Sequence, residues 1–343
     1  MEERMVKTFF IIVNNQASNG LKADVWQNIR TRLDSRKISY IFRKTKQVGN
    51  AKSLTKRYVS HLTKEEADET VVIVIGGDGT LTEVLNGIKE TPYKHVPLAF
   101  IPIGENNGFA QGIGIASNPM TALEQILSAT EPVYYDIGEY TETTHQSHGY
   151  FFNDFGIGLD AFVISLNSQA HKHKRLQKLL NKFHLKFLAY MVSAFEALIN
   201  QESFSATIRI GEKYEFFKHV AFVNVANHPY FDNGIVLSPT ANVNDHKLDL
   251  LIADNLGFFK FIILAISIYF KKQLKLPYLH HYKSDQIHLI INSLEFGQID
   301  GEKSETDILT SSTKHHNTLF RMNISSVLPQ NGDKNESAFN HQK

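Results

Sequence analysis

Cysteine is absent from the 343 residues of this sequence. Its absence excludes disulfides, thiolate metal sites and cysteine nucleophiles, and it fits a reducing compartment. Charge of either sign is not in excess, because 36 lysines and arginines stand against 35 aspartates and glutamates. Nucleic-acid-binding domains usually carry a strongly basic face, so we do not expect a nucleic-acid partner.

Long apolar runs are missing as well. The longest, Phe258–Phe270, contains Lys260 and is shorter than the about 20 residues that a membrane-spanning helix needs. The first ten residues mix charges of both signs, and the apolar run Phe9–Val13 is too short for the core of a signal peptide. We therefore expect no transmembrane segment and a cytoplasmic protein. The Phe-rich run is followed by Lys271 and Lys272, so it is either a core or interface helix or one that docks on a bilayer.

The first third of the sequence alternates strand and helix signals. Short apolar runs at Phe9–Val13, Val71–Ile75 and Leu98–Ile103 are typical of buried parallel strands. Apolar residues recur at helical spacing between these runs, as they do over residues 81–88. The alternation predicts an open parallel α/β domain over residues 1–136.

The pattern changes near residue 134, and 343 residues are too many for one ordinary compact domain. From there on, strand-like runs separated by turns predict a β-rich, sandwich-like domain over residues 137–317. One long helical stretch near 165–200 interrupts them. Residues 331–343 are polar with little periodicity, and we expect a disordered tail there.

The sharpest local signal is Gly76-Gly77-Asp78-Gly79-Thr80, which follows a predicted strand and precedes a helix expected to begin near Leu81. Glycines let the chain turn tightly and let a phosphate approach the amides, and the helix N-terminus adds positive partial charge. Asp78 is placed to orient a phosphate-bound metal ion. Thr80 and Glu83 form a T-x-x-E capping box that would fix the start of the helix. A plain glycine-rich turn is the alternative, but the order of strand, loop and helix favours phosphate binding.

The stretch Val71–Ile88, VVIVIGGDGTLTEVLNGI, resembles the catalytic domain of the diacylglycerol kinase family of bacterial lipid kinases. Further segments resemble this family in the same order along residues 7–325, and an ordered set is more specific than one motif. They are Asn14–Ser18, Ile101–Gly104, Phe109–Ala110, Tyr135–Gly138, Asn153–Gly158, Val225–Asn227, Pro239, Asp245, Asp249 and Ile299–Glu302. The resemblance implies an ATP- and Mg²⁺-dependent kinase that phosphorylates the hydroxyl of diacylglycerol or a related lipid at the membrane surface. It also implies that residues 318–330 return to the first domain.

The resemblance carries over to particular residues. Glu302 would be the general base that takes the proton from the lipid hydroxyl, because an unaided alcohol is a poor nucleophile. Asp-Gly-Glu at 300–302 also reads as a hairpin turn, and both roles can hold if the turn presents Glu302. Asp78 would act in catalysis among the phosphates. The ATP-contacting positions would be Thr45, Gly76, Gly77, Asp78, Gly79, Thr80, Leu81, Thr82 and Glu105.

A second implied site involves Asp245, which resembles a Mg²⁺ ligand supported by the main-chain carbonyls of Asn242 and Lys247. Oxygen ligands suit such a hard cation. The alternative is that Asp245 caps a turn before the strand Leu248–Ala253. His246 stands where glycine is common in the family.

The loop after Ile103 departs from the family pattern. Glu105 replaces a hydroxyl residue, and Gly108 replaces an acid. Because a carboxylate beside the triphosphate would repel it, we expect weakened ATP binding. Two other functions stay open: an NAD kinase, which shares Gly-Gly-Asp-Gly-Thr, and a non-catalytic lipid-binding regulatory protein. The sequence lacks the downstream Asn-Glu pair of NAD kinases, and it leaves open whether the chain forms a homodimer.

Overall fold

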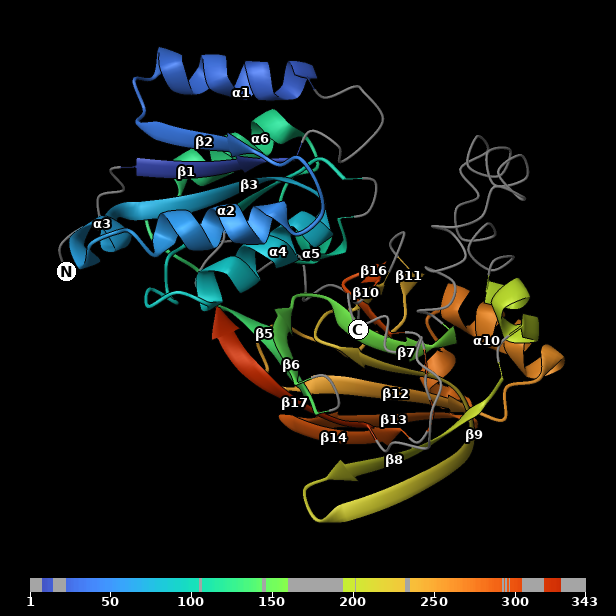
Figure 1. The fold of residues 1–343 in the computed structure, drawn as a ribbon. Helices are drawn as coiled ribbons and strands as arrows, with labels where there is room; N and C mark the ends of the chain where they lie inside the picture. The colour runs from blue at the N-terminus through green and yellow to red at the C-terminus, as the bar shows by residue number, and fades with distance from the viewer. Residues whose placement is uncertain are drawn as a thin grey trace. The chain divides into compact units, whose positions relative to one another are not determined.

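A computed structural model describes residues 8–14, 23–104, 107–143, 146–159, 194–200, 202–231, 235–291, 293, 295, 297–303 and 318–327. The chain divides into two compact units (Figure 1). The first comprises Met1–Tyr135 and Ser326–Lys343, and the second comprises Asp136–Ser325. Most of the helical stretch predicted near 165–200 lies outside the described residues.

The first unit is built on a four-stranded parallel sheet with the order β2-β1-β3-β4. Its strands are β1 (Thr8–Val13), β2 (Tyr40–Lys44), β3 (Thr70–Gly76) and β4 (Leu98–Pro102). Nearly every residue of β1, β3 and β4 is buried, as in strands that are covered on both faces. The predicted open parallel α/β architecture is confirmed.

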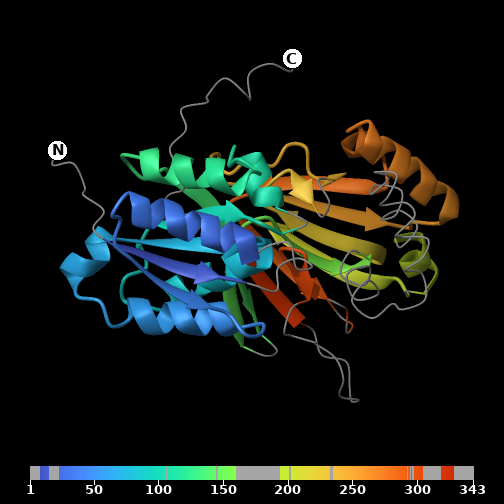
Figure 2. The same cartoon turned by 90° about the horizontal axis from the view of Figure 1, so that it is seen from above.

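Helices cover both faces of this sheet. On one face α1 (Ala23–Ser35) packs against α6 (Pro119–Ser128), and on the other α2 (Asn50–Val59) packs against α4 (Asp78–Lys89) (Figures 1 and 2). Right-handed crossovers require this arrangement, because the chain runs from β1 to β2 in one direction and from β2 to β3 in the other. The short helix α3 (Lys64–Glu69) precedes β3, and α5 (Gly108–Gly112) follows β4.

The second unit contains an 11-stranded sheet whose main path is β16-β15-β7-β9-β8-β14-β17-β5-β6, with β12 and β13 attached through β9. Its described pairings are antiparallel, which confirms the predicted β-rich domain. The strands are β5 (Tyr135–Glu142), β6 (Ser147–Phe151), β7 (Asp154–Gly158), β8 (Phe204–Ile210), β9 (Lys213–Ala226), β12 (Leu248–Asp254), β13 (Leu279–Ser284), β14 (Gln286–Ile291), β15 (Gly297–Ile299), β16 (Glu302–Lys303) and β17 (Thr318–Val327). A separate hairpin joins β10 (Tyr230–Phe231) to β11 (Ile235–Val236).

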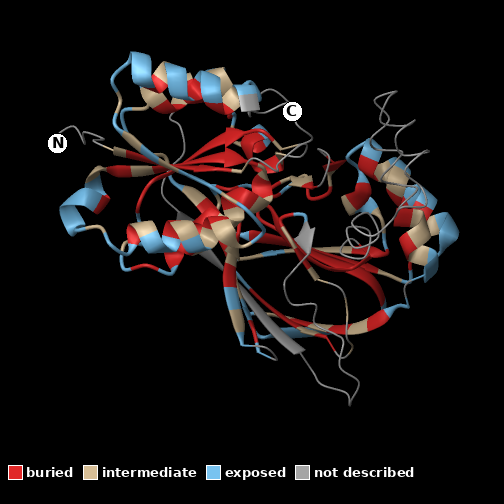
Figure 3. Ribbon diagram, turned by 45° about the horizontal axis from the view of Figure 1, so that its top comes forward, coloured by how far each residue is buried: buried red, intermediate tan, exposed pale blue. Residues whose placement is uncertain are grey.

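The central strands of this sheet bury both of their faces (Figure 3). Along β12, Leu248, Leu250 and Ile252 enter one apolar cluster, and Leu251 and Ala253 enter another. This alternation follows from the two-residue period of a strand. Helix α10 (Phe258–Tyr269) packs on the second cluster. Within the described residues, no helix has both the length and the apolar composition needed to cross a bilayer.

Candidate active site

The carboxyl ends of the parallel strands gather the predicted nucleotide loops on one edge of the sheet. The chain leaves β1 toward β2 and then returns past β1 to β3, so the strand order reverses between β1 and β3. Open α/β sheets bind ligands outside such a reversal, at the carboxyl ends of the strands. Asn14 follows β1 and the glycine loop follows β3, so both stand at the reversal.

Hydrogen bonds join the loops at this edge. The Asn14 amide donates from Nδ2 to Thr80 Oγ1 over 2.8 Å, across the reversal. The Thr45 backbone N–H donates to Val13 O over 3.0 Å, which brings Thr45 to the same edge. The loop must carry glycine at position 76, because a Cβ there would lie 2.8 Å from Thr80 Cβ.

Asp78 joins the glycine loop to the loop after β4. Its side chain is buried, and Oδ2 accepts a hydrogen bond of 2.8 Å from the backbone N–H of Gly108 at the start of α5. The backbone N–H groups of Ile103 and Gly104 donate to Gly76 O over 2.8 and 3.2 Å. These contacts fix the two loops against each other, and Asp78 is the side chain that links them.

The predicted capping box of Thr80 and Glu83 is wrong. Helix α4 begins at Asp78, and its N-cap Gly77 offers no side chain. The Glu83 carboxylate instead accepts backbone N–H groups of Gly49 and Ala51 at the start of α2, over 2.8 and 2.9 Å. A helix N-terminus leaves such donors without backbone partners, so a tertiary contact satisfies them here.

The other predicted nucleotide positions fall in and beside α4. Gly79 and Thr82 lie in its first two turns. Leu81 is fully buried, so any nucleotide contact by this residue would use its main chain. Glu105 lies outside the described residues.

In the second unit, the predicted turn before Glu302 is confirmed. Asp300 and Gly301 have φ values of 52° and 78°, the left-handed geometry that an Asp-Gly hairpin turn favours. The turn joins β15 to β16, and Ile299 pairs with Glu302. Glu302 is therefore the first residue after a tight hairpin turn.

A buried polar network anchors this hairpin. The Asp300 carboxylate accepts the three backbone N–H groups of residues 152–154 over 2.7–3.1 Å. The neighbouring Asp154 carboxylate accepts from Asn224 Nδ2 over 2.6 Å and from Gln298 Nε2. The sequence predicts a turn at Asp300 but no role for the side chains of Asp154, Asn224 and Gln298. The available signal was Asn224 inside the apolar run of β9, because a buried amide is costly unless it is hydrogen-bonded.

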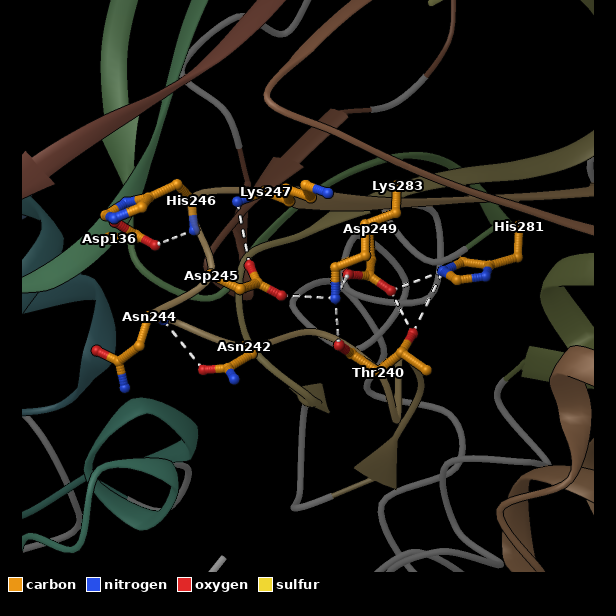
Figure 4. Close-up of polar contacts among 10 residues, drawn as sticks. All are labelled: Asp136, Thr240, Asn242, Asn244, Asp245, His246, Lys247, Asp249, His281 and Lys283. Carbon is orange, nitrogen blue, oxygen red and sulfur yellow. Dashed lines mark hydrogen bonds and ion pairs between the residues drawn. The ribbon is translucent and has the colours of Figure 1, made fainter. Parts of the chain in front are cut away.

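The predicted metal ligand Asp245 contacts a lysine (Figure 4). Lys283 Nζ lies 2.7 Å from Asp245 Oδ2 and 3.2 Å from Asp249 Oδ2, and it donates to Thr240 O over 2.7 Å. Asp249 is fully buried and also bonds His281 Nε2 over 2.6 Å.

Charge pairing outweighs burial in this cluster. Burial raises the pKa of the Asp249 carboxyl, but hydrogen bonds from His281 and Thr240 and the charge of Lys283 bring it below its ordinary value. Burial likewise lowers the pKa of Lys283, but Asp245 and Asp249 together raise it above its ordinary value. The cluster therefore holds an ammonium against two carboxylates.

These residues, as arranged, do not fit a resident Mg²⁺. The ammonium of Lys283 already occupies the position that a cation would take between the oxygens of Asp245, Asp249 and Thr240. Asn242 O accepts the Asp245 N–H over 3.4 Å, and Asp245 Oδ1 accepts the Lys247 N–H over 3.1 Å. Asp245 thus caps the turn, and the described residues hold no cluster of three histidine or acidic side chains for a metal.

His246 occupies a backbone conformation that explains why glycine is common there. Its φ is 57°, in the left-handed region. Its N–H donates to Asp136 Oδ2 over 2.7 Å, and its Nδ1 lies 2.8 Å from Asp136 Oδ1 (Figure 4). These two bonds offset the backbone strain of a non-glycine residue in the left-handed region.

The second unit also holds an apolar cavity of about 40 Å³ beneath α10. Its lining comes from the sheet, from the hairpin of β10 and β11 and from α10, and it includes Phe222, Phe231, Leu237, Phe261 and Leu264. Nearly all of the residues that line it belong to the second apolar cluster, so the cavity lies within that cluster.

Comparison with known proteins decides the family. Residues 8–139 match the diacylglycerol kinase catalytic domain, and residues 163–313 match the YegS C-terminal NAD kinase beta sandwich-like domain. The chain is 31% identical over 284 residues to "Putative lipid kinase YtlR" of Bacillus subtilis (strain 168), covering 81% of this chain and 88% of that one. This chain belongs to the diacylglycerol kinase catalytic-domain family.

A second relative and a solved structure agree. "Putative lipid kinase SH2167" of Staphylococcus haemolyticus (strain JCSC1435) is 27% identical over 261 residues, covering 74% of this chain and 77% of that one. The crystal structure of a putative diacylglycerol kinase from Bacillus anthracis str. Sterne superposes with a TM-score of 0.68 at 21% identity, covering 96% of this chain and 98% of that one. The latter likeness establishes a shared fold.

Proposed function

We propose that this chain transfers the γ-phosphoryl group of ATP to the hydroxyl of diacylglycerol or a related lipid. Membership of a kinase family supports a phosphotransferase. The observation that carries the proposal is the hydrogen-bonded glycine loop at the strand reversal, where Asn14 and Thr80 meet. A glycine loop that opens a helix at this place is suited to phosphate groups.

In this proposal the backbone of residues 76–79 and the N-terminus of α4 bind the phosphates. Asn14 orients the Thr80 hydroxyl, and Thr45 stands at the same edge of the sheet. Asp78 is a positioning residue, because its carboxylate holds the loop after β4 through Gly108. Magnesium that arrives with ATP supplies neutralisation of the phosphate charge.

Glu302 is proposed as the general base. Its carboxylate takes the proton of the lipid hydroxyl while that oxygen bonds to the γ-phosphorus. The bond from the γ-phosphorus to the β–γ bridging oxygen breaks, and ADP leaves with that oxygen. The anchoring of the hairpin through Asp300 supports this role, because a base must be held in place.

The apolar cavity beneath α10 is the proposed site for an acyl chain. Its lining is the kind of surface that an acyl chain prefers. At about 40 Å³ the cavity is far smaller than the roughly 300–1,000 Å³ of typical ligand pockets, so an acyl chain would have to displace its walls.

Radiolabelled ATP tests the proposal against diacylglycerol, a polyprenol, a sphingoid base and NAD as acceptors. We expect a labelled lipid phosphate, and Glu302→Gln should lower kcat by about 10²- to 10⁴-fold with ATP affinity little changed. Glu212→Gln is the matched control, because Glu212 is an exposed carboxylate in the turn between β8 and β9. Label on NAD alone would favour an NAD kinase, and no transfer to any acceptor would favour a regulatory lipid-binding protein.

A further inference from the structure

Exposed and buried residues alternate along α10 (Figure 3), and large apolar side chains are among the exposed ones, on the helix and at its C-terminal end. Among the described residues, thirteen large apolar side chains are exposed, and seven of them lie in this one stretch. They are Phe258, Phe259, Ile262, Ile263, Ile266, Tyr269 and Phe270. Patches of this kind mark interaction sites, whereas single exposed apolar residues do not.

Helix α10 is apolar on both of its sides. Its inner side buries Phe261, Leu264 and Ile268 against the sheet. On its outer side Phe259 is 78% exposed and Ile266 is 54% exposed. A helix that is apolar all round is normally enclosed, so the outer side has the composition of a surface that meets another apolar phase.

The charge at the C-terminal end of this face is positive. Residues 255–278 contain four lysines and no aspartate or glutamate. Lys271, Lys272 and Lys275 are exposed just beyond the helix, and the ammonium of Lys260 lies 5.1 Å from the ring centroid of Tyr278. An apolar helix face with a lysine rim is typical of helices that lie in the headgroup region of anionic membranes.

We propose that the outer face of α10 docks this protein on the surface of an anionic phospholipid bilayer. With 12 residues the helix is about 18 Å long, against a hydrocarbon core of about 30 Å, so it would lie in the interface plane and not span it. The proposal does not depend on kinase activity. In a lipid kinase, docking here would bring the cavity beneath α10 close to its substrate.

The other occupants of this face are disfavoured by charge. A twofold contact between two copies would bring no acidic side chain of residues 255–278 against the lysine rim, because such an interface uses the same patch twice and this stretch has no aspartate or glutamate. Residues 160–193 of the chain contain six lysines and arginines and one acid, so they too would bring like charge against the rim. Anionic headgroups complement the rim.

Co-sedimentation of the full chain with vesicles, without ATP, tests the proposal. The vesicles are phosphatidylcholine alone and phosphatidylcholine mixed with phosphatidylglycerol. We expect binding to the mixed vesicles that weakens with added salt. Lys271→Gln with Lys272→Gln should lower the partition coefficient about thirtyfold, and Phe259→Ser with Ile263→Ser should lower it at least about tenfold.

Matched controls lie on the β8–β9 hairpin of the same unit. Lys213→Gln with Lys218→Gln removes the same charge, and Phe216→Ser removes an exposed aromatic ring. We expect both controls to bind vesicles as the parent does. Equal losses in the controls and in the α10 variants would overturn the proposal, because binding would then follow net charge or general apolarity.

Two further results would also overturn it. Absence of vesicle binding together with a concentration-dependent dimer that Phe259→Ser abolishes would identify a second copy as the occupant. Absence of vesicle binding by a monomer would indicate that the chain covers α10 itself.

Phosphotransfer to a short-chain diacylglycerol in detergent micelles is measured separately. Vesicle binding without such transfer would refute the proposed function and leave the docking surface standing.

Discussion

Replacing Lys283 with methionine tests whether an ammonium holds the cluster around Asp249. The substitution keeps most of the length of the side chain and removes its terminal ammonium, which lies 2.7 Å from Asp245 Oδ2 and 3.2 Å from Asp249 Oδ2. Asp249 is fully buried, so the loss leaves its carboxylate with the hydrogen bonds from His281 and Thr240 alone.

The expected loss in the free energy of unfolding depends on how far Lys283 and its carboxylate partners are buried. At an effective dielectric near 20, charges at these distances attract by roughly 5–6 kcal/mol, part of which is cancelled by the hydration that the ammonium loses on folding. An exposed pair contributes about 0–1 kcal/mol, and removing one partner of a fully buried pair costs about 3–5 kcal/mol. The Lys283 side chain is 29% exposed, so we expect about 2–3 kcal/mol, or roughly 5–10 °C in the melting temperature of the second unit.

The same variant should gain a stabilisation by Mg²⁺ that the parent protein lacks. Without the ammonium, the oxygens of Asp245, Asp249 and Thr240 remain around its former position, and oxygen ligands suit Mg²⁺. We expect Mg²⁺ to raise the melting temperature of Lys283→Met and to leave that of the parent unchanged, both without nucleotide. At a Mg²⁺ concentration of 100 times Kd the gain would be about 2.7 kcal/mol.

Differential scanning fluorimetry with and without EDTA measures both effects, and Lys213→Met serves as the exposed control. A parent that Mg²⁺ stabilises as strongly as the variant would refute the reasoning and restore Asp245 as a resident metal ligand. A variant as stable as the parent would show that the ammonium contributes nothing.

Three further predictions concern single side chains. Burial lowers the pKa of His228 to about 4. Between pH 6.5 and 4 the imidazole therefore stays neutral in the folded state, whereas it takes up a proton in the unfolded state. The free energy of unfolding should fall by about 3 kcal/mol over this range. Urea unfolding of His228→Asn should show a flatter pH profile, and parallel profiles would contradict the assignment. Glu83→Gln should lower the free energy of unfolding by about 1–2 kcal/mol, because it weakens two charge-assisted hydrogen bonds to the start of α2. An unchanged free energy of unfolding in chemical denaturation would disprove the cap. If the Glu105 carboxylate faces the triphosphate, Glu105→Thr should tighten ATP binding at fixed free Mg²⁺. Relief of 1.4 kcal/mol of repulsion would lower Kd about tenfold. Equal dissociation constants for parent and variant would show that the carboxylate does not lie beside the phosphates.

The parallel sheet and the hairpin turn could be predicted because their causes are local. The run Val71–Ile75 is β-branched throughout, and such a run indicates a strand covered on both faces. Asp300 and Gly301 are neighbours, and this pair selects the left-handed turn found at that point.

The contacts that the sequence did not predict join residues far apart in the chain. The pattern Thr80-x-x-Glu83 is a sound capping signal, but Glu83 instead meets the start of α2, which lies more than thirty residues earlier in the chain. The turn at Asp245 is visible in the sequence, but its ion pair with Lys283 is not. Lys283 lies on β13, which pairs with β12 in an order that no local pattern specifies. Competing partners of this kind appear only when the sheet is assembled.

Mass spectrometry of the lipid product from ATP labelled with ¹⁸O in its γ-phosphoryl group tests the central claim most directly. The proposal predicts a lipid phosphate that carries all three terminal γ-oxygens of ATP and keeps the unlabelled oxygen of the lipid hydroxyl, because the phosphorus–oxygen bond to ADP is the one that breaks. Labelled inorganic phosphate with no labelled lipid, under conditions in which the protein binds ATP and the acceptor, would contradict it.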